Sequence, residues 1–259
     1  MSKFDDIDHI LSQWPFDPLS VNVRLLELNQ REVLQMRVDM GVLQLEIEGR
    51  PDGVQPDGSN TYYDLLMKKV RKNAEEFVLS EDECIEVDRE FVQFYHRRVC
   101  WLQLKHFDRA VQDADHTLGL MDFCKSHSPD EQWTISHEQY RPFVLYHRTQ
   151  AAALARLEMD VENCGELAIE EVDKGLLKLR QLFEDYDAEE QFEEDELIQR
   201  LIDFKNSLRE KYEIGNTLAE QLEQAIANED YERAAQLRDE IQTRQTEFDK
   251  GIDPQLDMK

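Results

Sequence analysis

Glycine and proline are scarce in this chain of 259 residues, which contains 9 Gly and 7 Pro. Because these residues form most tight turns, their scarcity favours long elements with few turns. Glu, Leu, Gln, Ala and Arg, which are good helix formers, recur throughout the sequence. With 41% hydrophobic residues the chain can bury a real core. We therefore predict an all-α fold of one large or two smaller domains.

The sequence also lacks the short motifs of common catalytic and metal sites. Its four cysteines form no CxxC pair, and its seven histidines form no HExxH. There is no GKS/GKT phosphate-binding loop, no GxSxG elbow and no EF-hand spacing. We therefore predict a protein that is not an enzyme and that holds no metal ion or cofactor.

Basic residues are few relative to acidic ones, with 30 Lys and Arg against 57 Asp and Glu, a net charge of −27. Since phosphate backbones attract Lys and Arg, direct nucleic-acid binding and anionic-membrane binding are disfavoured. No run of about 18 apolar residues could span a membrane, and the first residues do not form a signal peptide. We expect a cytoplasmic protein with reduced thiols whose partner is another protein.

Apolar periodicity predicts a series of helices. The expected segments are 21–48, 62–77, 80–105, 107–124, 138–159, 167–186 and 197–212. Ser80 and Glu83 form a capping-box pattern at the start of the third segment. The stretch Leu43–Glu48 alternates with period two and also fits a strand, but helix is preferred because no second convincing strand is present. Residues 49–60, with two Pro-Asp-Gly turns, are read as an exposed connection rather than a binding loop.

A short internal repeat lies in the middle of the chain. Tyr95-His96-Arg97 recurs as Tyr146-His147-Arg148, and each copy belongs to a predicted helix pair. The stretch 95–120, with Trp101 and Ala110 at its aromatic and small positions, resembles a tetratricopeptide repeat. That resemblance implies helix-pair repeats acting as a binding scaffold, and a generic helical bundle is the equally weighted alternative.

A run of acidic residues separates two parts of the chain. Residues 184–196 contain nine acids and no base, which is typical of a solvated linker or exposed helix end. We predict a helical tetratricopeptide-like domain over residues 1–184, an acidic linker over 185–196, and a helix plus a helical hairpin over 197–250.

The C-terminal segment predicts two amphipathic helices. Leu218, Leu222, Ala225 and Ile226 share one apolar face, and Asp230 is placed to cap the second helix. The run Tyr231-Glu232-Arg233-Ala234-Ala235-Gln236-Leu237-Arg238-Asp239-Glu240-Ile241 then follows. This segment, about 218–245, resembles the UVR motif, the helical hairpin of the UvrB helicase and UvrC nuclease of excision repair. The motif also occurs in Clp-protease ATPases and in the activator of protein arginine kinase.

The UVR resemblance implies that the hairpin pairs with another protein or with a second copy of itself. It carries the predicted partner-binding residues, which are Leu218, Leu222, Tyr231, Ala234, Ala235, Leu237, Arg238 and Ile241. We expect a protein-interaction scaffold or adaptor. Two alternatives remain, an accessory factor in nucleotide excision repair or Clp-type protein quality control, and a helical enzyme with an unrecognised site.

Overall fold

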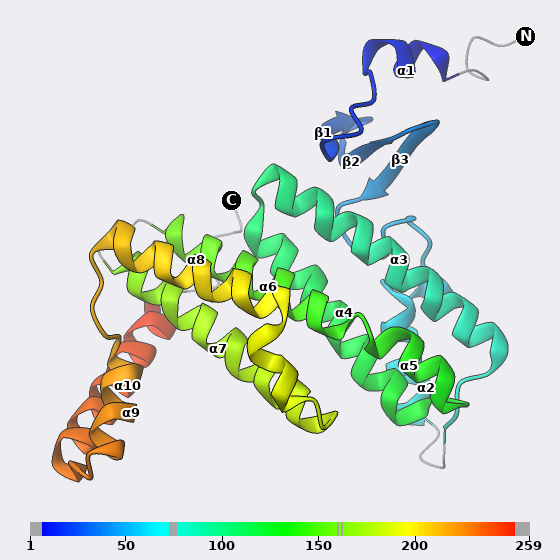
Figure 1. Ribbon diagram of the computed structural model, residues 1–259. Coiled ribbons are helices and arrows are strands. Elements are labelled where there is room, and N and C mark those ends of the chain that lie inside the picture. Colours follow the sequence, from blue (N-terminus) through cyan, green and yellow to red (C-terminus); the bar gives the residue numbers. More distant parts are fainter. Residues whose placement is uncertain (1–6, 73–76, 160, 162, 252–259) are drawn as a thin grey trace, which may run out of the picture.

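The computed structural model describes residues 7–72, 77–159, 161 and 163–251, with side chains described up to residue 243. Most of this chain is helical, which confirms the predicted fold class (Figure 1). The α-helices are α1 Asp8–Gln13, α2 Tyr62–Lys72, α3 Glu81–Leu104, α4 Phe107–His127, α5 Glu131–Glu138, α6 Arg141–Leu157, α7 Cys164–Asp185, α8 Glu196–Tyr212, α9 Leu218–Ala227 and α10 Tyr231–Gly251. The predicted helix over 62–77 extends into residues 73–76, which lie outside the described residues. None of the described helices is long and apolar enough to cross a membrane.

The helix predicted over residues 21–48 is wrong. This segment forms a three-stranded antiparallel sheet of β1 (Asn22–Leu28), β2 (Arg31–Val38) and β3 (Gly41–Glu46), in the order β1-β2-β3. Asn29 and Gln30, both with positive φ, make the two-residue turn between β1 and β2, a conformation that matches the twist of a β-hairpin. The two residues are neither Gly nor the usual Asn-Gly pair, so the turn signal in the sequence is weak.

Both faces of the central strand β2 are covered, so polar as well as apolar side chains of this strand are buried. On one face Leu34 and Met36 join Trp101 of α3 in a single apolar cluster. On the other face Gln35 accepts hydrogen bonds from Arg24 and donates to Gln44. The segment before β1 packs on this polar face, where the ring of Trp14 lies 4.2 Å from the Arg24 guanidinium carbon.

The helical body contains three further apolar clusters. One joins α2, α3 and α4 through Leu66, Val87 and Leu120, and another joins α6, α7 and α8 through Leu145, Ile169 and Leu201. A small third cluster joins α4 and α6 through Met121 and Val144. The capping box predicted at the start of α3 is present, since Glu83 N donates to Ser80 Oγ and Ser80 N donates to the Glu83 carboxylate. The sheet and the C-terminal hairpin lie at opposite ends of this body (Figure 1).

The acidic segment is partly packed onto the body. Residues Glu189–Glu194 form a 3-10 helix, and Phe192, 4% exposed, enters the α6–α8 cluster, where its ring lies 5.5 Å from that of Phe183. Asp195 then caps α8 by accepting hydrogen bonds from Leu197 N and Ile198 N. The division of the chain at 185–196 stays a prediction. In the structure, α8 shares an apolar cluster with α6 and α7, the helices before this segment.

Candidate interaction site at the C-terminal hairpin

A polar cap fixes the start of the hairpin. Glu220 N donates to Thr217 Oγ1 at 3.3 Å, and Thr217 N donates to Glu220 Oε2 at 3.0 Å, a capping box that the sequence reading did not identify. Thr217 is fully buried, although it stands between two helices. The cap therefore defines the direction in which α9 leaves α8.

The turn between α9 and α10 uses local backbone and side-chain bonds. Asp230 N donates to Ala225 O, and Glu229 adopts a positive φ of 55°. The predicted cap of α10 is present, because Arg233 N donates to Asp230 Oδ1 at 3.1 Å. This three-residue connection lets α9 and α10 pack along their length.

Five of the predicted partner-binding residues lie in or near the interior of the hairpin. Leu218 of α9 and Ala234 and Leu237 of α10 are buried, with exposed fractions of 6%, 9% and 1%, and Ala225 joins them. Leu222 and Ile241 are half-buried at the edge of this cluster. In this structure each helix thus covers the apolar face of the other, so these residues stabilise the hairpin itself.

The remaining predicted residues are exposed on one side of α10. Tyr231 is 70% exposed, and Ala235 and Arg238 are exposed four and seven positions further along the helix. Residues at these spacings lie on the same side of a helix. We call Tyr231, Ala235 and Arg238 the exposed stripe. Arg238 donates to the adjacent Asp239 rather than to Glu223 across the hairpin.

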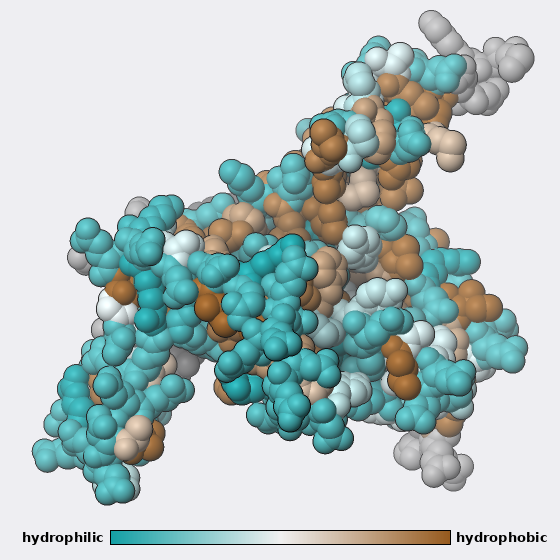
Figure 2. Space-filling view, viewed as in Figure 1, coloured by the Kyte–Doolittle hydropathy of each residue, from teal (hydrophilic) through white to brown (hydrophobic). Residues whose placement is uncertain are grey.

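Ile226 of α9 adds an apolar side chain to the hairpin surface. The sequence predicts Ile226 on the apolar face of α9, but its side chain is 53% exposed. Most of the hairpin surface in Figure 2 is hydrophilic, with a small apolar patch. Aromatic residues are enriched at the centres of protein–protein interfaces, so Tyr231 is the feature of this surface that fits such a contact.

Glu220 attaches the hairpin to the body. Its Oε1 accepts a hydrogen bond from Lys205 Nζ of α8 at 2.7 Å and another from Arg209. Lys205 also donates to Asp173 of α7 at 2.5 Å. Although burial raises the pKa of Glu220, the bonds from Lys205, Thr217 N and Arg209 bring that pKa below its ordinary value. Glu220 is therefore ionised at neutral pH and links α9 to α8.

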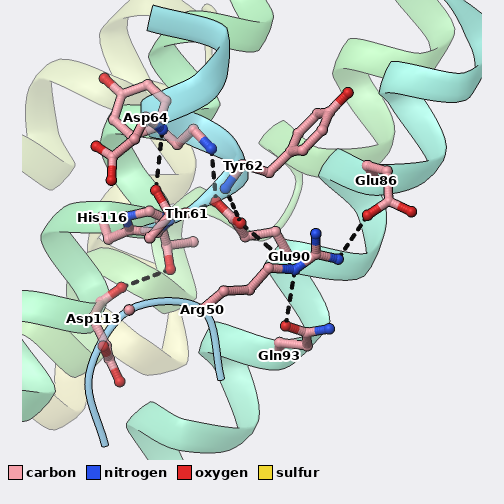
Figure 3. Close-up of polar contacts among 12 residues, drawn as sticks. Arg50, Thr61, Tyr62, Asp64, Glu86, Glu90, Gln93, Asp113 and His116 are labelled. Carbon is pink, nitrogen blue, oxygen red and sulfur yellow. Dashed lines mark hydrogen bonds and ion pairs between the residues drawn. The ribbon is translucent and has the colours of Figure 1, made fainter. Parts of the chain in front are cut away.

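A second polar cluster lies beneath the loop of residues 49–60 (Figure 3). The sequence predicts this loop to be an exposed connection. Arg50 in this loop is 2% exposed, and its Nη2 lies 2.8 Å from Glu86 Oε2 of α3. Fully buried Glu90 accepts hydrogen bonds from Tyr62 N at 2.6 Å and Tyr63 N at 3.0 Å, and it contacts His116 Nε2 at 3.0 Å. The prediction of an exposed connection for residues 49–60 is wrong at Arg50, Pro51 and Ser59, which are buried. The segment also joins β3 to α2 rather than two helices.

Glu90 holds this cluster together. It accepts hydrogen bonds from the first turn of α2, and its Oε2 lies 3.9 Å from Arg50 Nε. The cluster thereby anchors the loop and α2 onto α3. Over the described residues no group of three or more His, Cys, Asp or Glu side chains is arranged to hold a metal ion.

Comparison with known families identifies the hairpin. The family model of the UvrB/uvrC motif, UVR, matches residues 216–243, which contain α9, the turn and the described first part of α10. Such motifs occur in proteins of excision repair and of Clp-type protein quality control and mediate protein–protein interactions. Comparisons with curated proteins and with solved structures give no match. The tetratricopeptide resemblance of residues 95–120 is not confirmed by these comparisons.

Proposed function

We propose that the protein is a non-enzymatic, cytoplasmic adaptor that docks another protein, or a second copy of itself, through its UVR hairpin. The observation that carries this proposal is the position of the matched motif. It forms a two-helix unit that projects from the helical body with the exposed stripe uncovered (Figure 1). A projecting hairpin with its own interior can contact a partner without unfolding.

The charge of the hairpin indicates a protein partner. Residues 217–243 contain two basic and seven acidic side chains, a net charge of −5. Direct binding to a phosphate backbone would place this surface against like charge. A role in excision repair or in Clp-type quality control would therefore run through a protein of that pathway, recognised by the hairpin.

The experiment compares two variants that each add one negative charge to α10. Tyr231→Glu changes the exposed stripe, and Gln236→Glu changes an exposed position of the same helix outside it. Both substitutions introduce Glu, which is compatible with a helix. The full chain and both variants are used as bait, with purified UvrB-type helicase and Clp-type ATPase as prey, and the mass of each bait in solution is measured.

We expect complex formation or dimerisation to be lost in Tyr231→Glu and kept in Gln236→Glu. Loss of both, or of neither, would argue that the exposed stripe is not the docking surface. If no complex forms with either prey and the chain is monomeric, the adaptor role in these pathways is contradicted. Dimerisation alone that depends on Tyr231 would identify the second copy as the partner.

A further inference from the structure

A cavity of ≈ 680 Å³ lies between α3, α4, α5 and α6, and none of its lining residues belongs to the hairpin or is labelled in Figure 3. Its walls are mainly apolar, with Phe91, Val92, Tyr95, Met121, Phe143 and Val144 among the lining residues. This volume is within the range of roughly 300–1,000 Å³ found for small-molecule sites. Val92 and Tyr95 are 55% and 41% exposed, so the cavity opens at an apolar rim.

One cation, Arg98, lines this apolar cavity. Its side chain is 2% exposed, and Nη1 donates to Thr117 Oγ1 at 3.0 Å. Nε is buried and has no hydrogen-bond partner within the described part of the chain, where no carboxylate lies within 4.0 Å of the guanidinium. A buried charge without a counter-ion is costly, and proteins normally pair such groups.

The carboxylate whose charge acts on Arg98 is already paired with another arginine. Asp113, the carboxylate whose field acts on Arg98, accepts hydrogen bonds from Arg97 Nε and Nη2 at 3.0 and 2.7 Å. Arg97 also donates to two backbone carbonyl groups, Glu46 O and Gly49 O, so its own bonds are satisfied. Asp113 is therefore paired with Arg97, and Arg98 forms no ion pair with a carboxylate of the described residues.

His147 adds no second positive charge beside Arg98. Its Nδ1 is buried without a hydrogen-bond partner in the described residues. Burial and the neighbouring Arg98 charge lower the pKa of His147 to about 4, so it is neutral at pH 7. Burial also lowers the pKa of Arg98 to about 10, which still leaves the guanidinium protonated at neutral pH.

We propose that this cavity binds a small amphiphile with one carboxylate, such as a medium- or long-chain fatty acid, whose head group pairs with Arg98. The apolar walls suit an alkyl chain, which needs no hydrogen bonds. A bound peptide would bring backbone N–H and C=O groups, which must be satisfied wherever they are buried. A free inorganic anion would have to enter a protein of net charge −27 without the gain from apolar contact.

This proposal is independent of the adaptor role and has its own test. Titration calorimetry on the full chain at pH 7.5 compares decanoate, decyltrimethylammonium and inorganic phosphate. Both amphiphiles are kept below the concentrations at which they form micelles. The first two share a tail and differ in the charge of the head group. The net negative charge of the protein favours the cationic amphiphile, so a preference for decanoate would have to come from a local cation.

We expect decanoate to bind at least about ten-fold more tightly than decyltrimethylammonium, and phosphate not to bind. Arg98→Met should abolish this preference, and Arg98→Lys should retain part of it. Val92→Glu, at the exposed rim, should weaken decanoate more than decyltrimethylammonium without disturbing the fold. A thermal unfolding profile of each variant confirms that it is folded.

Three results would overturn the proposal. They are equal affinity for the two amphiphiles, a preference for decanoate that survives in Arg98→Met, and no binding of decanoate at all. Phosphate binding as tight as that of decanoate would also contradict it, because the apolar walls would then contribute nothing. A rise in thermal stability of Arg98→Met without ligand would support the view that the guanidinium lacks a counter-ion.

Discussion

Glu220 Oε1 and Lys205 Nζ lie 2.7 Å apart, and this ion pair joins the first turn of the UVR hairpin to α8. The same carboxylate closes the capping box with Thr217. One side chain therefore both starts α9 and attaches it to the body. The position of the hairpin depends on the ionisation of this carboxylate.

Glu220→Gln should lower the free energy of unfolding by about 1 kcal/mol at pH 7, because Gln can still complete a capping box but cannot form the ion pairs. The folded-state pKa of Glu220 lies below the ordinary glutamate value of 4.5. Its contribution is therefore present above about pH 4.5 and is lost as pH falls through the lower, folded-state pKa. Urea unfolding from pH 7 to pH 3 should show the difference between wild type and variant shrinking with acidity. Glu223→Gln, exposed on the same helix, is the control, and an equal effect there would contradict the assignment.

Leu237→Ala should open the hairpin and leave the body folded. Leu237 is 1% exposed in a cluster made only of hairpin residues, and such a truncation costs about 2–5 kcal/mol. Hydrogen exchange followed by mass spectrometry should show loss of protection in α9 and α10 but not in α7. Gln236→Ala, at an exposed neighbouring position, should leave protection unchanged. Loss of protection throughout the chain would show instead that the hairpin and the body unfold together.

Gly175→Ala should destabilise the contact between α6 and α7, although Ala favours helix over Gly by about 1 kcal/mol. A Cβ atom at Gly175 would lie 2.7 Å from Thr149 Cβ, and rotation of the Thr149 side chain cannot relieve this overlap. We expect a net loss of about 1–3 kcal/mol, measured by thermal or urea unfolding. Gly119→Ala is the matched control in α4, where the nearest atom is the movable Tyr63 hydroxyl at 3.2 Å. Equal stability of the two variants would mean that α6 and α7 can separate at little cost.

Glu90→Gln should cost about 2–4 kcal/mol, because an amide nitrogen would face a buried N–H donor in place of a carboxylate oxygen. The affected donors are Tyr62 N and Tyr63 N at the start of α2. Glu86→Gln, whose side chain is 30% exposed and also pairs with Arg50, should cost less. Urea unfolding of the three proteins tests this order, and a larger loss in Glu86→Gln would reverse the roles assigned to the two carboxylates.

Local signals predicted the helical part of the chain well. Ser80 and Glu83 indicated the start of α3, and Asp230 indicated the start of α10. The UVR hairpin was recognisable because its small, charged and apolar residues follow one another in a fixed order. These features depend on residues a few positions apart, which interact with each other in almost any context.

The sheet could not be predicted in the same way. Alternation with period two is limited to β3 and to residues 34–38 of β2. Both faces of β2 are covered by elements distant in sequence, including Trp14 and Trp101. The turn at Asn29 and Gln30 lacks the usual glycine. Strand identity here depends on pairing and burial, and these are tertiary properties.

The amino-acid sequence by itself determined the mainly helical class, the caps of α3 and α10, and the UVR hairpin, because each rests on local periodicity and hydrogen bonding. Only the tertiary structure decided which of the hairpin residues are buried and which are exposed. Leu237 and Tyr231 both read as candidates for contact, but packing of α9 on α10 buries the first and exposes the second. The tertiary structure also decided which of two adjacent arginines has a carboxylate partner, because Arg97 hydrogen-bonds to Asp113 and Arg98 does not. Burial of a charged side chain costs free energy when elements distant in sequence exclude water from it. A local sequence pattern does not indicate such burial.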